Sequence, residues 1–187
     1  SVLREEGGFA FKKAIVDTLL TIIARVPEAK EPGLAQLCEF IEDCEFTLLS
    51  TQILHLLGVE GPSTPEPSKY IRFIYNRVVL ENATVRASAV SALAKFGVQI
   101  PHLRSSITVL LQRCFYDNDD EVRDRAILYY TVIKGMDEDV TVAGKSAQEM
   151  LIEPLPVPLA AIEASCREYM AAPTEQPFGL QDVTIDA

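Results

Sequence analysis

The chain repeats itself, and this internal repeat restricts the possible fold more than any other feature of the sequence. An apolar stripe of four residues occurs three times, at offsets of 37 and then 36 residues. The three stripes are Leu34, Leu37, Cys38 and Ile41; Ile71, Ile74, Tyr75 and Val78; and Ile107, Leu110, Leu111 and Cys114. Spacings of three and four residues place the side chains of each stripe on one face of a helix.

The segments between these stripes repeat as well. Residues 43–58, 82–97 and 119–135 align at offsets of 39 and 37 residues. The matched positions are Phe46, Val85 and Val122; Ser50, Ala89 and Ala126; and Leu54, Leu93 and Tyr130. The small residue in the middle of each segment lets two helices approach closely.

Two alternating helices within a period of 36–39 residues are typical of an α-solenoid of the HEAT or armadillo type. A single helix pair cannot bury its apolar face, so successive antiparallel pairs have to stack. No segment shows the sustained alternation of a strand. The sequence therefore predicts an all-α solenoid over residues 1–171, part of a longer trunk, and an extended segment over 172–187 that leads to a linker.

The expected helix ends follow the same repeat. After a first helix that begins beyond Gly7 and Gly8, helices are expected at 33–42, 45–57, 68–80, 83–96, 102–115, 119–134, 146–152 and 158–170. The face of the first helix is expected to comprise Phe11, Ile15, Leu19, Ile22, Ile23 and Val26. The expected N-terminal caps are Asp43, Asn82 and Asp119. The expected C-terminal caps are Gly58, Gly97 and Gly135.

A formal net charge of −10 restricts the partners of the chain. Nucleic-acid affinity depends on neutralising phosphates with Lys and Arg, so no nucleic-acid partner is expected. Docking on anionic lipid needs a local basic cluster, and no apolar stretch reaches the length of a membrane span. Four scattered cysteines without a CxxC pair, and no visible secretory signal, predict reduced thiols in a cytosolic protein. Because the first residue is Ser1 rather than Met, we expect a piece of a longer protein.

Residues 67–80, PSKYIRFIYNRVVL, interleave aromatic and basic residues as a nucleic-acid surface would. On a helical wheel, Ile74 and Tyr75 belong to the repeated apolar stripe and Phe73 points to nearly the opposite side. A helix that is apolar on two sides lies between neighbours, so these side chains are expected in the core. The residues expected to face outward, candidates for a protein interface, are Lys69, Arg72 and Arg77.

No motif for catalysis, cofactor binding or metal binding is complete. The AGKS of residues 143–146 ends like a P-loop, but Asp139 stands where that motif requires glycine. The DNDDE of residues 117–121 resembles a calcium loop, but Val122 and Leu128 replace its glycine and its closing glutamate. We therefore expect neither an enzyme nor a cofactor.

The remaining chemically active residues also have structural interpretations. His55 and His102 lie far apart, and neither stands near a cysteine at metal-ligand spacing. Arg86 and Arg123 recur at one repeat position, which predicts a ladder of arginines bonding acids of the adjacent repeat. The cysteines expected to be buried, unreactive thiols on apolar stripes are Cys38, Cys114 and Cys166.

Seven blocks carry a resemblance to a known family: LREEGGF, KKAIVD, GLAQLCEFIEDCEFT, ILHLLG, PSKYIRFIYNRVVLEN, VRASAVSALAKFG and DNDDEVRDRA. Together they resemble the gamma subunits of coatomer, the COPI vesicle coat, from about residue 3 to about residue 134; PFGLQDV adds a weaker match near the end. The resemblance implies the C-terminal half of the adaptin-like trunk, ahead of a flexible linker to an appendage domain.

The same resemblance implies a structural scaffold in Golgi-to-ER and intra-Golgi transport, cytoplasmic and peripheral on Golgi membranes and COPI-coated vesicles. The implied partners, reached through the full-length parent, are the zeta, beta and delta subunits and an Arf-family GTPase. The family's zeta and Arf contacts belong mainly to the N-terminal half of the trunk, so no Arf-contact residue is assigned here. No direct membrane insertion is expected, and the fragment itself is expected to be monomeric.

The repeats alone leave an alternative open. A HEAT-type recognition module of another complex, binding a peptide or a small GTPase in its concave groove, would use the same extended, curved surface. The seven blocks favour the coat scaffold. Co-purification of the other coatomer subunits from cytosol would distinguish the two.

Overall fold

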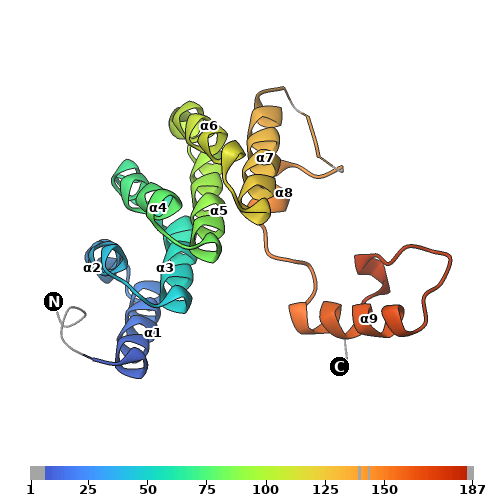
Figure 1. The fold of residues 1–187 in the computed structure, drawn as a ribbon, viewed down its shortest axis with the longest axis horizontal. Helices are drawn as coiled ribbons and strands as arrows, with labels where there is room; N and C mark the ends of the chain where they lie inside the picture. Colours follow the sequence, from blue (N-terminus) through green and yellow to red (C-terminus); the bar gives the residue numbers. More distant parts are fainter. Residues whose placement is uncertain (1–6, 139, 143, 185–187) are drawn as a thin grey trace. The chain divides into compact units, whose positions relative to one another are not determined.

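The computed structural model describes residues 7–138, 140–142 and 144–184, and its long regular elements are all helices (Figure 1). The chain divides into two compact units, Ser1–Ile152 and Glu153–Ala187. The first unit contains α1 (Phe9–Arg25), α2 (Lys30–Glu42), α3 (Thr47–Glu60), α4 (Ser68–Leu80), α5 (Ala83–Gln99), α6 (Arg104–Arg113), α7 (Asp120–Gly135) and α8 (Ala147–Leu151). The second unit contains α9 (Leu159–Ala171). Within the described residues, paired extended backbone is limited to one bridge between Val142 and Lys145.

The helices of the first unit lie in two layers (Figure 1). One layer is the row α1, α3, α5 and α7, in which α5 packs against both α3 and α7. The other layer contains α2, α4 and α6, and α4 and α6 also pack on α5. The short α8 packs on α5 and α7. This arrangement of stacked helix pairs confirms the predicted all-α solenoid.

The repeated stripes form the core of this unit. Nine of their twelve side chains are buried, and Ile71, Tyr75 and Leu110 are partly buried against them. The three small residues at the middle of the second helices, Ser50, Ala89 and Ala126, are also buried. In α1 the predicted Ile23 is buried and the predicted Ile15 and Leu19 are partly buried, but Val16, which was not predicted, is buried as well. The predicted members Phe11, Ile22 and Val26 are exposed.

Side-chain caps begin two of the repeated helices as predicted. The Asn82 side chain accepts a hydrogen bond from the Val85 N–H, and the Asp119 side chain accepts one from the Val122 N–H, each at 3.2 Å. The predicted cap Asp43 is wrong, because this residue ends α2 and an extended segment separates it from α3.

The predicted glycine caps are also wrong: Gly58 and Gly97 lie inside α3 and α5, and Gly135 is the last helical residue of α7, without a positive φ. A Cβ atom on Gly58 would lie 3.1 Å from Cα of Ala92 in α5. A Cβ atom on Gly97 would lie 2.9 Å from Cδ1 of Ile133 in α7. These two glycines permit close approach of neighbouring helices rather than a left-handed turn.

The second unit begins earlier than the predicted boundary after residue 171, so α9 belongs with the C-terminal segment. Prolines at 154, 156 and 158 interrupt the helical pattern before α9. The segment after α9 folds back on it rather than running straight. The Tyr169 hydroxyl donates to the Gln176 carbonyl at 2.9 Å, and the Thr184 N–H donates to the Ser165 hydroxyl at 3.1 Å.

Parts of two earlier predictions lie outside the described residues. They are residues 185–187 of the expected extended segment, and Asp139 and Ala143 of the rejected P-loop motif. A search of the described helices finds none with the length and apolar character needed to cross a membrane.

Candidate interaction surfaces

Arg77 in α4 points into the protein rather than outward, so its place on the predicted surface strip was wrong. It is only 4% exposed. Its Nη1 donates to the carbonyls of Ile41 and Glu42 at 3.0 and 3.2 Å, and it pairs with the Glu81 carboxylate at 2.7 Å. The last carbonyls of a helix have no partner within the helix, and Arg77 supplies one for α2 from the next helix pair.

Lys69 and Arg72 do lie at the surface of α4, beside acids of the preceding helix pair. Lys69 Nζ is 3.1 Å from the Glu31 carboxylate, and this hydrogen bond raises the pKa of Lys69. Arg72, whose side chain is 74% exposed, lies 3.9 Å from the Glu42 carboxylate. Because the chain's own acids partly balance both cations, this strip is a poor surface for a polyanion.

The aromatic residues of α4 pack as predicted, with one addition. Ile74 is buried, and Phe73 and Tyr75 are partly buried against the core. Tyr70 is among the largest fully buried side chains, although it stands outside the repeated stripe. It precedes Ile74 by four residues, and this spacing was the signal that could have identified it.

Arg86 forms the predicted contact between repeats. Its Nε and Nη2 donate to the two carboxylate oxygens of Asp117 at 2.9 and 2.7 Å, and Nη1 donates to the Glu81 carbonyl at 2.8 Å. The pKa of Asp117 is lowered, first by this hydrogen bond with Arg86. Arg123 pairs with Asp120 of its own helix instead, so the predicted ladder was wrong at that position. The acid-rich turn before α7 serves both arginines.

Ion pairs recur between successive helix pairs. They join Lys30 to Glu60, Lys69 to Glu31, Arg86 to Asp117, and Arg104 to Asp137. Exposed pairs contribute little stability individually, whereas the partly buried bidentate Arg86 pair fixes the register between repeats.

Burial keeps two of the thiols protonated. Burial, with Glu42 nearby, raises the pKa of Cys38 to about 12, and burial also raises that of Cys114 to about 11. Cys44 is buried as well. Cys166 is only partly buried, contrary to prediction, and lies on the apolar face of α9 beside Ile162 and Met170. In the described part of the chain, no three His, Cys, Asp or Glu side chains form a potential metal site.

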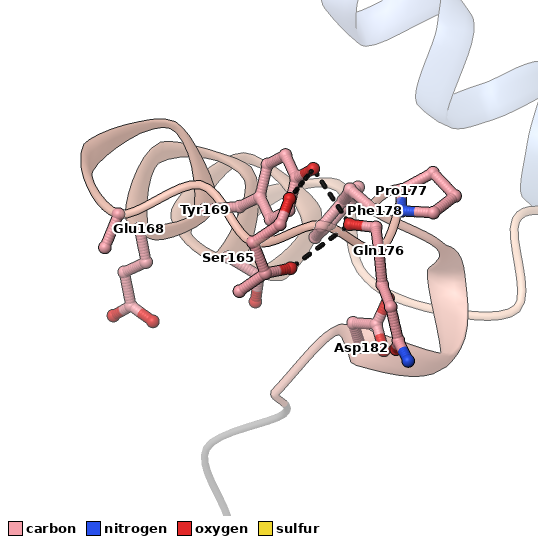
Figure 2. Close-up of a pocket in the computed structure, with 9 residues that line it drawn as sticks. Ser165, Glu168, Tyr169, Gln176, Pro177, Phe178 and Asp182 are labelled. Carbon is pink, nitrogen blue, oxygen red and sulfur yellow. Dashed lines mark hydrogen bonds between the residues drawn. The ribbon is translucent and has the colours of Figure 1, made fainter.

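The second unit contains a pocket of about 350 Å³ between α9 and the segment that folds back on it (Figure 2). The rings of Tyr169 and Phe178 form one wall, with centroids 5.7 Å apart. Figure 2 shows the hydrogen bond that the Tyr169 hydroxyl of α9 donates to the Gln176 carbonyl of this segment. The charged residues that line the pocket are two acids, Glu168 and Asp182, and the Asp182 carboxylate accepts a hydrogen bond from the Gly179 N–H of its own segment.

The comparisons with known proteins identify the family. Residues 1–137 match the model of the adaptin N-terminal region. The chain belongs to this family. The chain is similar to coatomer subunit gamma of Arabidopsis thaliana, with 60% identity over 184 residues. It is also similar to coatomer subunit gamma-1 of Bos taurus, with 55% identity over 185 residues, and to coatomer subunit gamma-2 of Homo sapiens, with 52% identity over 185 residues.

These alignments cover 98–99% of the adaptin-family chain but only 20–21% of each relative, so the chain spans about a fifth of their length. The resemblance to coatomer gamma subunits that the seven blocks indicated is thus confirmed. The match to the adaptin N-terminal region indicates that the chain corresponds to the N-terminal part of such proteins. The finer position, in the C-terminal half of the trunk, stays a prediction.

Proposed function

We propose that this chain is a non-catalytic scaffold segment of a COPI coat subunit that acts in vesicle transport between Golgi and ER and within the Golgi. The observation that supports this most strongly is its 52–60% identity to coatomer gamma subunits across almost its whole length. Adaptin-type domains are structural components of coats, and a stacked solenoid suits that work because each repeat is held by its neighbours.

The proposed partners are the other coatomer subunits, zeta, beta and delta, and an Arf-family GTPase, all contacted through the full-length protein. The proposed location is the cytoplasm, with peripheral association on Golgi membranes. The fragment alone is proposed to be a monomer without a cofactor, without nucleic-acid affinity and without membrane insertion.

Two kinds of surface support contacts with other proteins. Apolar side chains of α1 and α9 are exposed, including Phe11 at 46% and Met170 at 75%. Exposed apolar residues grouped on one helix are common at protein interfaces. On α4, Lys69 and Arg72 remain proposed interface residues, whereas Arg77 is withdrawn because it is buried.

A chimaera tests the scaffold proposal. The corresponding segment of a tagged, full-length coatomer gamma subunit is replaced by this chain, and the proteins that co-purify from cytosol are identified. We expect the other coatomer subunits in stoichiometric amounts. The matched control carries Ala89→Leu, which disrupts a buried helix contact and should reduce assembly.

Two results would contradict the proposal. One is a folded chimaera that recovers no coat subunits. The other is capture of peptides or a GTPase without coat subunits, which would favour the HEAT-type recognition module.

A further inference from the structure

A small basic recess lies on the α3, α5 and α7 layer, outside the surfaces described above. Its volume is about 240 Å³, and its lining residues are His55, Ser88, Ser91, Ala92, Lys95 and Arg125. Three of these are basic and none is acidic, in a chain whose net charge is −10. Because Glu121 pairs with Arg125 and the imidazole of His55 is neutral, the uncompensated positive charge of the recess is that of Lys95.

Lys95 is the central charge of the recess. It is partly buried, and its stem lies near Gly58, where an added Cβ would be 3.2 Å from Lys95 Cδ. No described carboxylate pairs with its ammonium group. Burial accordingly lowers the pKa of Lys95. Removing a cation from water without a counter-charge is costly, and an anionic ligand would offset that cost.

Arg125 forms one wall and is held in place by its neighbours. Its Nε pairs with Glu121 at 2.5 Å, and its Nη1 donates to the Ser91 hydroxyl at 3.0 Å. Ser91 also lies 3.2 Å from the Tyr129 hydroxyl. Nη2 of Arg125 has no hydrogen-bond partner among the described residues. Its free edge is thus a fixed donor, with little side-chain entropy left to lose on binding.

The remaining polar groups of the recess are neutral. Burial and the neighbouring Lys95 lower the pKa of His55 below its usual 6.5, so the imidazole is neutral at pH 7 and has one N–H to donate. The Ser88 hydroxyl has no partner among the described residues. Lys95 is an unpaired cation, Arg125 has a free N–H edge beside its pair with Glu121, and two neutral donors lie next to them. This set of donors suits a carboxylate, whose two oxygens accept about four hydrogen bonds.

We propose that this recess binds one carboxylate side chain of an acidic peptide segment in a protein partner, with Lys95 and Arg125 as the charged contacts. This proposal rests on the proposed scaffold function, because it takes the ligand to be part of a partner protein. The recess holds only a side chain or two. A polyphosphate would leave further negative charge against a protein that carries −10, whereas a peptide carboxylate adds a single charge at the recess.

Fluorescence anisotropy at low ionic strength, with a labelled and terminally capped peptide that carries one glutamate among neutral residues, tests the site in the full chain. We expect binding that weakens with added salt and becomes about tenfold weaker in Lys95→Gln and in Arg125→Gln. The matched control is Lys134→Gln, which removes the same charge from an exposed position nine residues beyond Arg125, on the opposite face of α7. This control should bind the peptide like the unmodified chain.

A second measurement, NMR of the unmodified protein, tests the site without relying on a variant that could fold poorly. In ¹⁵N-labelled unmodified protein, the peptide should shift backbone signals centred on residues 88–95 of α5. Three results overturn the site: no binding by the unmodified chain, an equal loss in Lys134→Gln, or binding of inositol hexakisphosphate in place of the peptide. If the peptide fails to bind while the chimaera still recovers coatomer, the site is wrong and the scaffold function stands.

Discussion

Individual charged residues inside this solenoid are stabilised mainly by the neighbouring helix pair. Arg77 bonds the terminal carbonyls of α2, and Arg86 bonds Asp117 before α7. In both cases the arginine and its partner are more than 30 residues apart in sequence. A charge placed this way links repeats, because its removal leaves an unpaired group in a poorly solvated place.

Replacing Arg86 by Gln should lower the free energy of unfolding by about 1.5–3 kcal/mol at pH 7, since Asp117 loses a charged hydrogen-bond partner. The pKa of folded Asp117 lies below its usual 3.8, so its contribution is present above that pH and is lost as the pH falls through the lowered pKa. Urea unfolding at pH 7 and at pH 3 should therefore show a smaller difference between variant and parent in acid.

The control for this prediction is Arg72→Gln, because the Arg72 side chain is 74% exposed. It should change stability by about half a kcal/mol or less. A difference for Arg86→Gln that stays constant with pH would contradict a role for the Asp117 carboxylate.

The four cysteines should differ in reactivity. Only a thiolate reacts rapidly, and burial raises the pKa of Cys38 and Cys114 to about 12 and 11. Cys44 is buried too, whereas Cys166 is partly accessible on α9. Labelling of the native chain with a maleimide at pH 7, followed by peptide mass spectrometry, should modify Cys166 first. Labelling in urea is the control and should modify all four; rapid native labelling of Cys38 would contradict the assigned packing.

At the scale of helices, the small residues in α5 and α7 determine how closely the layers pack. Ala89→Leu inserts three heavy atoms at a fully buried position and should cost about 1–3 kcal/mol. Ala35→Leu is the matched control, because Ala35 is exposed on α2 and both residues favour helix. Thermal unfolding followed by circular dichroism measures both, and equal melting temperatures would contradict the assigned helix contact.

The sequence features used to predict the helices differed in how specifically each one reports a single structural cause. The apolar stripe predicted α4 over its observed bounds, because periodicity directly reports a buried face. Gly58 and Gly97 were misassigned because a left-handed cap and a close helix contact both require a missing Cβ, and sequence alone does not separate them. Arg77 was misplaced because a helical wheel gives direction but does not show the α2 carbonyls it meets.

The candidate binding recess lay further beyond sequence reasoning. His55, Lys95 and Arg125 come from three helices and are separated by 30 residues or more, with no spacing motif among them. Only the stacking of α3, α5 and α7 brings them together. Such a site depends on the repeat register and not on any local signature.

At the scale of the whole molecule, the chain consists of two units that should differ in their independence. The first unit buries the repeated stripes in one continuous core, whereas α9 and its folded segment form a separate, smaller unit. The chain between α8 and α9 contains three prolines and mostly exposed residues. Exposed, proline-interrupted segments with few contacts are typical domain boundaries and sites of proteolytic cleavage.

Truncation after Ile152 should therefore leave the first unit folded. We expect its melting temperature to match the main transition of the full chain, because the buried apolar side chains among the described residues all lie before residue 152, and Ser165 is the one buried residue described in the second unit. Truncation after Gln99 is the control: it removes α6 and α7, uncovers α5 and should lower the melting temperature strongly, since each repeat depends on its neighbours. If truncation after Ile152 instead destabilised the chain as much as truncation after Gln99, α9 would be a structural part of the solenoid, and the predicted boundary after residue 171 would be the better one.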